Sequence, residues 1–415
     1  MSNKRVLIVG AGPGGLSCGM ILAQKGLDVT IIDRADRAGG RNASFNLADY
    51  TFDIGPTFFL MKDVLEDIFE QTGLKLENYI KLQHVDPMYR LAFSEEKAFY
   101  PSTDDTKMKE ELERVFPGSS SDYDRYMTQE KKKYDKLIPC LQLPYDSITS
   151  LLKTRFIGAL RYLDAHVSLF DVLGRYFKYE ELKLAFTFQA KYIGMSPWKA
   201  PGTFSIISYI EHGGGIWHVE GGLNQLSAGM AKAYEDLSGK LQLSTEVAKI
   251  NVENGKSTGV TLSDGTQIDA DYVVINADFG YAMTKLVDEK HRKKFTDKKL
   301  ASKEYSCSTF MLYLGLNHRY EDLPHHNIIF ADDYRENVSD ITDRFSLGED
   351  LSFYVQNACI MDPSLAPESK STLYVLVPAP NNNSGIDWEA RKPLLRERVL
   401  DLLETRGGFS NIRQY

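Results

Sequence analysis

The sequence predicts an α/β fold in which a parallel-sheet domain, made from two separated segments, is interleaved with a second domain of mixed β-sheet and helices. Three observations support this prediction. A short apolar run leads into a glycine-rich turn and a helical stretch near the N-terminus, strand-like segments with a hairpin signal return at 241–278, and further β-rich segments lie between 306 and 380. At 415 residues, the chain has room for two or three domains.

Composition and charge narrow the class of protein. Lys and Arg number 49 against 57 Asp and Glu, and the resulting net charge of -8 disfavours a nucleic-acid partner. No run approaches the roughly 18 to 20 apolar residues of a membrane-spanning helix, and the first apolar stretch is too short for a secretory signal peptide. The four cysteines, Cys18, Cys140, Cys307 and Cys359, lack the spacing of metal ligands or of a disulfide scaffold. We therefore expect no metal and a reduced, cytoplasmic compartment.

The sharpest signal lies close to the N-terminus. In order it comprises an apolar strand at Lys4–Gly10, the turn Gly10-Ala11-Gly12-Pro13-Gly14-Gly15, a helical stretch at Leu16–Gln24, a second strand at Asp28–Ile32, and Asp33. In this G-x-G-x-x-G pattern Gly10 permits a tight turn, Gly12 lets the backbone approach a pyrophosphate, and Gly15 lets the helix pack closely on the strand. The helix start offers N–H groups to phosphates, and Asp33 is placed to accept hydrogen bonds from ribose hydroxyls. The order predicts a Rossmann-like dinucleotide site. The alternative is a glycine-rich turn in an ordinary parallel sheet, in which the position of Asp33 would be a coincidence.

The residues after Asp33 select among dinucleotides. Residues 34–41 read RADRAGGR and residues 52–57 read FDIGPT, and a nicotinamide-binding unit has no need of a Gly-Gly-Arg at that place. Here the sequence resembles the flavin-dependent amine oxidase and carotenoid desaturase superfamily. The resemblance implies FAD as the cofactor, with Arg41 reaching its pyrophosphate and the GPT triplet passing close to the flavin ring. The alternative for Arg41 is a loop cation in a surface salt bridge.

A second piece of the same domain is expected far downstream. Strand-like runs at 241–252 and 259–262 flank the hairpin signal Asp264-Gly265, and residues 271–278 read DYVVINAD, a buried strand ending in small and polar residues. By resemblance, Val247 lies against the adenine and the Asn276-Ala277 turn lies near the cofactor. The predicted domains are 1–85 and 216–290 for FAD, with 86–215 and 291–415 for a helical and mixed-sheet substrate domain.

The motifs and the resemblance together assign one set of cofactor-binding positions. These are Gly10, Gly12, Gly14, Gly15, Asp33, Arg34, Gly40, Arg41, Gly55, Pro56, Thr57, Val247, Asn276 and Ala277.

The segment Pro144–Lys191 has the periodicity of helices and carries a local basic amphipathic patch. Its apolar positions are Leu151, Leu152, Phe156, Leu160 and Leu163, interleaved with Lys153, Arg155 and Arg161. Such a helix can lie on an anionic membrane with its apolar side chains directed inward. The alternative is an ordinary surface helix packed on the body of the protein.

The β-rich segments in the second half identify a branch of the superfamily. Residues 306–316 read SCSTFMLYLGL, 325–330 read HHNIIF, 351–359 read LSFYVQNAC, and 371–380 read STLYVLVPAP. With the N-terminal motifs they resemble the bacterial carotenoid desaturases, that is, the phytoene and diapophytoene desaturases, along essentially the whole chain. The resemblance implies FAD-dependent desaturation of a long polyisoprenoid hydrocarbon by an enzyme on the membrane surface. The electron acceptor stays open between oxygen and a membrane quinone. The 23 Tyr and 21 Phe would suit a tunnel for such a substrate.

Other functions of the same superfamily stay open at this point. A carotenoid isomerase, a retinol saturase-like enzyme and a carotenoid terminal oxidase share the cofactor motifs, and Rab GDP-dissociation inhibitors share the fold without using a flavin. The intact glycine motif, Asp33 and the Gly-Gly-Arg argue against the last of these.

Catalytic side chains are not assigned by the sequence. Glu211, His212, His218 and Glu220 lie near glycine-rich turns and could accept a proton or stabilise a cationic transition state, but they could equally fix loops and cap helices. The pair His325-His326 predicts no metal site, because adjacent strand residues point to opposite faces.

The chain stops at residues 407–415, GGFSNIRQY, without the glycine- and proline-rich segment that closes over the flavin in the resembled family. We expect a C-terminally truncated copy, and a loss of this segment could weaken FAD binding or turnover. The alternative is a short family member.

Overall fold

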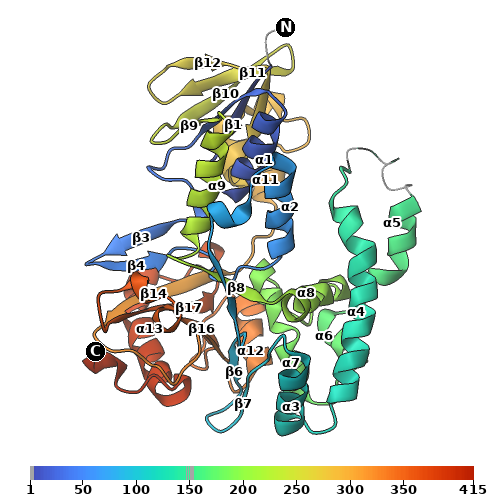
Figure 1. Cartoon of the computed structure of the whole chain (residues 1–415), viewed down its shortest axis with the longest axis vertical. Coiled ribbons are helices and arrows are strands. Elements are labelled where there is room, and N and C mark those ends of the chain that lie inside the picture. The colour runs from blue at the N-terminus through green and yellow to red at the C-terminus, as the bar shows by residue number, and fades with distance from the viewer. Residues whose placement is uncertain (1–3, 146, 148, 150–153) are drawn as a thin grey trace. The chain divides into compact units, whose positions relative to one another are not determined.

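The computed structural model describes residues 4–145, 147, 149 and 154–415, which form two compact units (Figure 1). Unit 1 comprises the described residues up to Gln83 together with Trp217–Glu304, and unit 2 comprises His84–Ile216 and Tyr305–Tyr415. The chain passes between the units within β5 (Leu82–Val85), at the start of β8 (Ile216–Val219), and after Glu304. The sequence predicted the third crossing at residue 290, but in the structure it follows Glu304.

The late crossing has a local cause in unit 1. The ring of Phe295 packs edge-on against Phe279, with centroids 4.8 Å apart. Arg292 is buried and pairs with Asp297 at 2.8 Å. These contacts hold residues 291–304, including α11 (Asp297–Ala301), in unit 1.

Unit 1 is built on a parallel sheet with the strand order β13-β1-β2-β9. Its strands are β1 (Arg5–Val9), β2 (Asp28–Ile32), β9 (Lys240–Gln242) and β13 (Tyr272–Ile275). The central strand β1 pairs in parallel with β2 on one side, where Arg5 lies opposite Asp28, and with β13 on the other, where Val6 lies opposite Tyr272. The two predicted segments of the domain therefore meet at β1.

Two layers cover the faces of this sheet. Because successive strand residues face opposite sides, Val6 and Ile8 pack with the helical layer, while Leu7 and Val9 pack with the second sheet. The helical layer consists of α1 (Pro13–Gln24), α2 (Lys62–Thr72) and α9 (Asn224–Asp236). The second sheet is antiparallel, with β10 (Val247–Glu253), β11 (Lys256–Leu262) and β12 (Gln267–Asp269). The remaining elements of unit 1 are the hairpin β3 (Ser44–Leu47) and β4 (Tyr50–Asp53), and α10 (Phe279–Tyr281).

Unit 2 contains a six-stranded mixed sheet with the order β14-β17-β16-β15-β6-β7. The strands are β6 (Arg90–Ala92), β7 (Ala98–Phe99), β14 (Ser308–Leu316), β15 (His326–Ile329), β16 (Phe353–Asn357) and β17 (Ser371–Ala379). The four later strands lie where the sequence predicts them. The sequence missed β6 and β7, which are only 3 and 2 residues long. Such short runs carry no measurable period, and they belong to the sheet because β6 pairs in parallel with β15.

Helices occupy the rest of unit 2. They are α3 (Asp105–Val115), α4 (Ser120–Leu141), α5 (Thr154–Ala159), α6 (Leu169–Gly174), α7 (Glu180–Ala185), α8 (Ile206–Gly214), α12 (Tyr334–Ser339) and α13 (Trp388–Leu402). The helical pattern expected over 144–191 forms short helices, and the longest helix, α4, precedes it. Of the predicted basic patch, Leu151, Leu152 and Lys153 lie outside the described residues. Among the described residues, no helix has the length and apolar character needed to cross a membrane.

We predict that Leu373→Ala strongly destabilises unit 2. Leu373 is completely buried in β17, in the cluster between the six-stranded sheet and α13. Truncating a buried leucine to alanine should reduce the free energy of unfolding by about 2–5 kcal/mol. Urea unfolding followed by circular dichroism measures this change.

Leu394→Ala is the matched control, because Leu394 of α13 is 64% exposed. Its free energy of unfolding should change by less than about 0.5 kcal/mol. Equal effects of the two substitutions would contradict the assignment of the core.

Candidate functional site

The turn between β1 and α1 is so tight that side chains are excluded from it. Gly10 has a φ of +109°, and a Cβ there would lie 2.4 Å from the carbonyl oxygen of Asn276. A Cβ on Gly15 would lie 2.1 Å from the carbonyl oxygen of Gly10. Both glycines are therefore required by the fold, and the start of α1 comes directly against the end of β1.

The side chain of Asn276 lies within this turn. Its Nδ2 donates to the carbonyl oxygen of Gly10 at 3.4 Å, and a Cβ on Gly14 would meet its Oδ1 at 2.8 Å. The backbone N–H of Asn276 donates to Val9 at 2.8 Å. Asn276 thus joins the end of β13 to the glycine turn.

Asp33 follows β2 at the same edge of the sheet. One carboxylate oxygen accepts the N–H of Ala11 at 2.7 Å, and the other accepts the N–H of Ala35 at 2.9 Å. Each carboxylate oxygen can accept a second hydrogen bond. The acid therefore ties the glycine turn to β2 and retains capacity for a hydroxyl group.

Hydrogen bonds from α9 fix the Gly39-Gly40-Arg41 loop. Asn224, a buried residue at the first turn of α9, donates through Nδ2 to the carbonyl oxygens of Ala38 at 3.0 Å and Asn42 at 2.7 Å. The carboxylate of Asp53 accepts the N–H of Leu223 at 3.0 Å and of Asn224 at 3.3 Å. Asp53 of the FDIGPT segment therefore caps the start of α9. Sequence reasoning missed Asn224, because nothing near it in the chain marks this contact.

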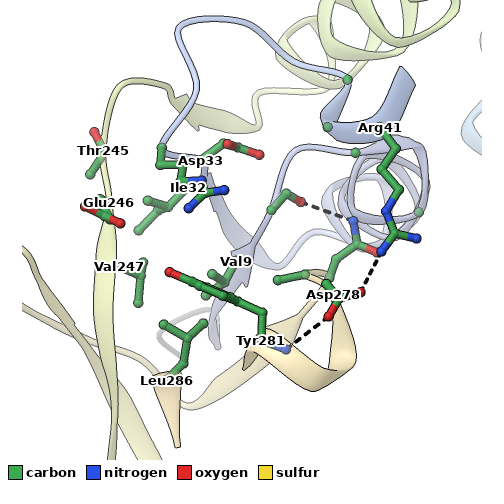
Figure 2. Close-up of a pocket in the computed structure, with 18 of the residues that line it drawn as sticks. Val9, Ile32, Asp33, Arg41, Thr245, Glu246, Val247, Asp278, Tyr281 and Leu286 are labelled. Carbon is green, nitrogen blue, oxygen red and sulfur yellow. Dashed lines mark hydrogen bonds and ion pairs between the residues drawn. The ribbon is translucent and has the colours of Figure 1, made fainter. Parts of the chain in front are cut away.

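These segments enclose a cavity of about 540 Å³ in unit 1 (Figure 2). It is lined by Val9, Gly10, Gly12, Pro13, Gly14, Ile32, Asp33, Arg34, Gly39, Gly40, Arg41, Thr245, Glu246, Val247, Asn276, Ala277, Asp278, Tyr281 and Leu286. Most of the predicted cofactor positions are in this set. The exceptions are Gly15, which packs under the turn, and Gly55, Pro56 and Thr57, which do not line the cavity.

Two charged contacts shape the cavity's rim. Arg41 donates from Nη2 to the Asp278 carboxylate at 2.6 Å, and its side chain is 84% exposed. The guanidinium of Arg34 lies over the ring of Tyr281 at 5.5 Å, and that ring projects into the cavity (Figure 2). Sequence reasoning did not assign Asp278 or Tyr281. Their place directly after the Asn276-Ala277 turn is the signal that could have found them.

The lining has the chemistry of a dinucleotide site. Gly12 caps the start of α1 with Pro13 in its first turn, so that backbone N–H groups and the positive end of the helix dipole are directed at the cavity. Arg34 and Arg41 add two cations to the lining, the charge that suits phosphates, and Asp33 adds a hydrogen-bond acceptor, the chemistry that suits a ribose hydroxyl. The residues present therefore fit a bound dinucleotide.

The four catalytic candidates named from the sequence are divided between the two units. Glu211 and His212 are buried in α8 of unit 2, where they share a hydrogen-bond network with Tyr89. In unit 1, His218 is buried in β8, whereas Glu220 is exposed and lies 3.5 Å from Lys81.

The two adjacent histidines are buried in unit 2. His326 Nδ1 lies 2.8 Å from the Tyr354 hydroxyl, and His325 Nε2 lies 3.1 Å from Gln356 Nε2. Within the described part of the chain, no three His, Cys, Asp or Glu side chains are grouped so as to hold a metal ion.

Comparison with known proteins defines the class. The family described as flavin containing amine oxidoreductase matches residues 13–407. An oxidoreductase from Methanosarcina mazei has the same fold, with a TM-score of 0.63 and 16% identity over 97% of this chain and 85% of that one. The chain belongs to the flavin-containing amine oxidoreductases, and FAD is its cofactor.

Relatives with higher sequence identity show which branch of the flavin-containing amine oxidoreductases the chain belongs to. A 4,4'-diapophytoene desaturase (4,4'-diapolycopene-forming) from Methylomonas sp. is 48% identical over 414 residues, covering 100% of this chain and 81% of the relative. A zeta-carotene-forming phytoene desaturase from Myxococcus xanthus is 35% identical over 95% of this chain and 76% of the relative. The protein is a member of the carotenoid desaturases, as the sequence predicted.

We predict that Asp33→Ala weakens FAD binding. The substitution removes the acceptor for the N–H groups of Ala11 and Ala35 and the acceptor expected for a ribose hydroxyl. A hydrogen bond to a charged group contributes about 1.5–3 kcal/mol, so the FAD dissociation constant should rise about 10- to 100-fold. Titration of the apoprotein with FAD, followed by flavin fluorescence, measures it.

Asp36→Ala is the control, because Asp36 is an exposed acid of the same loop that does not line the cavity. It should leave the dissociation constant unchanged. Arg41→Ala should also weaken binding, since it leaves the Asp278 carboxylate uncompensated at the rim. Unchanged affinity in both Asp33→Ala and Arg41→Ala would contradict the assignment of the site.

Proposed function

We propose that this protein desaturates 4,4'-diapophytoene, a long isoprenoid hydrocarbon of carotenoid biosynthesis. The observation that carries this proposal is the 48% identity to a 4,4'-diapophytoene desaturase along the whole chain. The lower identity of 35% to a phytoene desaturase makes phytoene the second substrate to test.

The cavity of unit 1 supports our proposal for where the cofactor binds. We assign the pyrophosphate to the N–H groups at the start of α1 and to Arg41, the ribose to Asp33, and the adenine to the side of the cavity that Val247 lines. Gly55, Pro56 and Thr57 stay assigned to the flavin end by resemblance. Bound there, FAD supplies the acceptor for a hydride.

The protein's part in this reaction is to hold an apolar chain and exclude water. A hydrocarbon offers no polar handle, so its binding depends on apolar area removed from water, at about 25 cal/mol per Å². Buried aromatic side chains are dense in the helical part of unit 2, where Tyr89 packs on Phe188 and Phe186 stacks on His212. Such surroundings keep the reaction free of competing water.

A membrane surface is the proposed source of the substrate. The described residues around the end of α4 and α5 leave apolar side chains exposed, with Leu141 at 76%, Tyr145 at 43%, Ile157 at 53% and Leu160 at 49%. Figure 1 shows α4 and α5 side by side at this end of unit 2. Arg161 is exposed beside them, which suits anionic headgroups. We propose that this apolar tip docks on the bilayer.

We predict that the purified protein with FAD, added to liposomes that carry 4,4'-diapophytoene, yields products with additional conjugated double bonds. Pigment extraction and absorbance spectra measure the gain. A parallel reaction with phytoene compares the two substrates, and anaerobic reactions with and without an added quinone test the proposed electron acceptors, a membrane quinone and oxygen.

Reactions without protein or without FAD are the controls. Products that differ only in double-bond geometry would indicate an isomerase. If substrate binds and no conjugated double bond forms with either hydrocarbon, the desaturase proposal is wrong.

We predict that Leu160→Asp and Ile157→Asp reduce binding to anionic liposomes. A charged side chain cannot enter the acyl region as leucine or isoleucine does. Cosedimentation should show a several-fold lower bound fraction.

Leu394→Asp places the same charge at a leucine of α13 that is 64% exposed and lies outside the apolar tip, and it should leave cosedimentation unchanged. An equal loss in all three variants would indicate a charge effect and contradict docking through the tip.

A further inference from the structure

An ion pair lies at the rim of the unit 1 cavity, between two residues that line it. Arg41 Nη2 donates to Oδ2 of Asp278 at 2.6 Å, and the two side chains are 84% and 54% exposed. Figure 2 shows the Arg41 side chain extending toward this carboxylate. Among the described residues that line the cavity, no other two are joined by an ion pair. A cation that suits a phosphate is therefore already held by a carboxylate of the same cavity.

The backbone that carries Arg41 is fixed beside the start of α1. The N–H of Gly39 donates to the carbonyl oxygen of Ala11 at 2.9 Å. A Cβ on Gly40 would lie 3.6 Å from the Cα of Gly12, the residue that precedes the first turn of α1. Because the Arg41 side chain itself is exposed, its guanidinium can change partners by side-chain rotation while this loop stays in place.

Asp278 is the stationary member of the pair. Its Oδ1 accepts the N–H of Tyr281 at 3.0 Å and so caps the short helix α10. It also follows directly after the Asn276-Ala277 turn, in which the Asn276 side chain packs against the glycine turn. The carboxylate is thus held by its own segment, and Arg41 is the side chain that can leave the pair.

The charges of the lining indicate what the pair does in a dinucleotide site. The carboxylates of Asp33, Glu246 and Asp278 face the guanidinium groups of Arg34 and Arg41. A pyrophosphate is anionic, so a carboxylate at the rim opposes its binding by attracting Arg41 and by repelling the phosphates. An anionic ligand must therefore replace Asp278 as the partner of Arg41 before it gains that cation.

We propose that Asp278 competes with the pyrophosphate of FAD for the Arg41 guanidinium, and that this competition limits the affinity of the protein for its cofactor. The proposal rests on the placement of FAD in this cavity under the proposed function. Binding of FAD then exchanges one ion pair for another, so the contribution of Arg41 is reduced by the strength of the pair that it leaves. A role for Asp278 in orienting Arg41 toward the phosphates predicts the opposite sign, because loss of the carboxylate would then weaken binding.

Asp278→Asn tests the competition without removing the helix cap. Asparagine caps a helix start as well as aspartate does, but it has no charge with which to hold Arg41. FAD is removed from the full-length protein and titrated back, and flavin fluorescence measures binding. From the usual strength of exposed ion pairs, the FAD dissociation constant should fall by at least about 2-fold. An unchanged or a raised dissociation constant overturns the proposal.

A double-variant cycle with Arg41→Ala separates competition from simple repulsion. Repulsion between Asp278 and the phosphates persists when Arg41 is absent, whereas competition for the guanidinium does not. The decrease caused by Asp278→Asn should therefore be about 2- to 5-fold larger when Arg41 is present than in the Arg41→Ala background. Equal decreases in the two backgrounds would show repulsion alone, and the competition would be wrong.

Asp36→Asn is the matched control for the loss of one negative charge. Asp36 is an exposed acid that pairs with Arg37 at 3.3 Å and does not line the cavity. Its substitution should leave the FAD dissociation constant unchanged. A decrease as large as that in Asp278→Asn would indicate an effect of net charge and contradict the proposal.

ADP and riboflavin locate the effect along the cofactor. ADP carries the pyrophosphate without the flavin, so Asp278→Asn should increase its affinity by the same factor, measured by displacement of FAD. Riboflavin has no phosphate, and its affinity should not change; an equal gain for riboflavin overturns the inference. If Arg41→Ala changes the affinity of neither FAD nor ADP, the placement of FAD is wrong. None of these measurements needs turnover, so a protein that meets them and desaturates neither hydrocarbon contradicts the proposed function alone.

Discussion

The glycine turn after β1 packs directly against the side chain of Asn276, and neither leaves room for a larger residue in the other. Side chains on Gly14 and Gly15 would collide with the Asn276 amide, at 2.8 and 2.9 Å. Asn276 lies 266 residues downstream of Gly10. The cavity of unit 1 is therefore complete only when β13 has paired with β1, so its formation needs both segments of the discontinuous domain.

The parallel sheet and glycine turn of unit 1 were predictable because their signals are local. A strand, a glycine turn, a helix and an acid follow one another directly, so spacing alone placed Gly10, Gly12 and Asp33. The supports of that site were not predictable. Asn224 and Asp53 act across about 170 residues of chain, and no short-range pattern marks them. Likewise β6 enters the second sheet only through pairing with β15.

Buried charge in unit 2 is handled in two different ways. Glu130 and Lys133 are both buried, but they lie 3.2 Å apart, and Lys133 also contacts Asp164 at 3.0 Å. Burial opposes ionisation of Asp164, yet hydrogen bonds from Arg175 and Lys133 lower its pKa. That network compensates each charge and needs no function to explain it. Glu211 has only neutral partners, so its protonation changes the net charge of its surroundings.

Lys191 is a base whose pKa is shifted by burial, as that of Glu211 is, but in the opposite direction. Burial lowers its pKa to about 7, and its Nζ contacts the Ser352 hydroxyl at 2.6 Å and lies 4.5 Å from the centre of the Tyr334 ring. Desolvation thus favours the neutral form of both the acid and the base in this part of unit 2. Because the neutral form avoids the cost of a buried charge, Glu211 and Lys191 can lie among neutral partners, whereas Glu130 and Lys133 are buried as an ion pair.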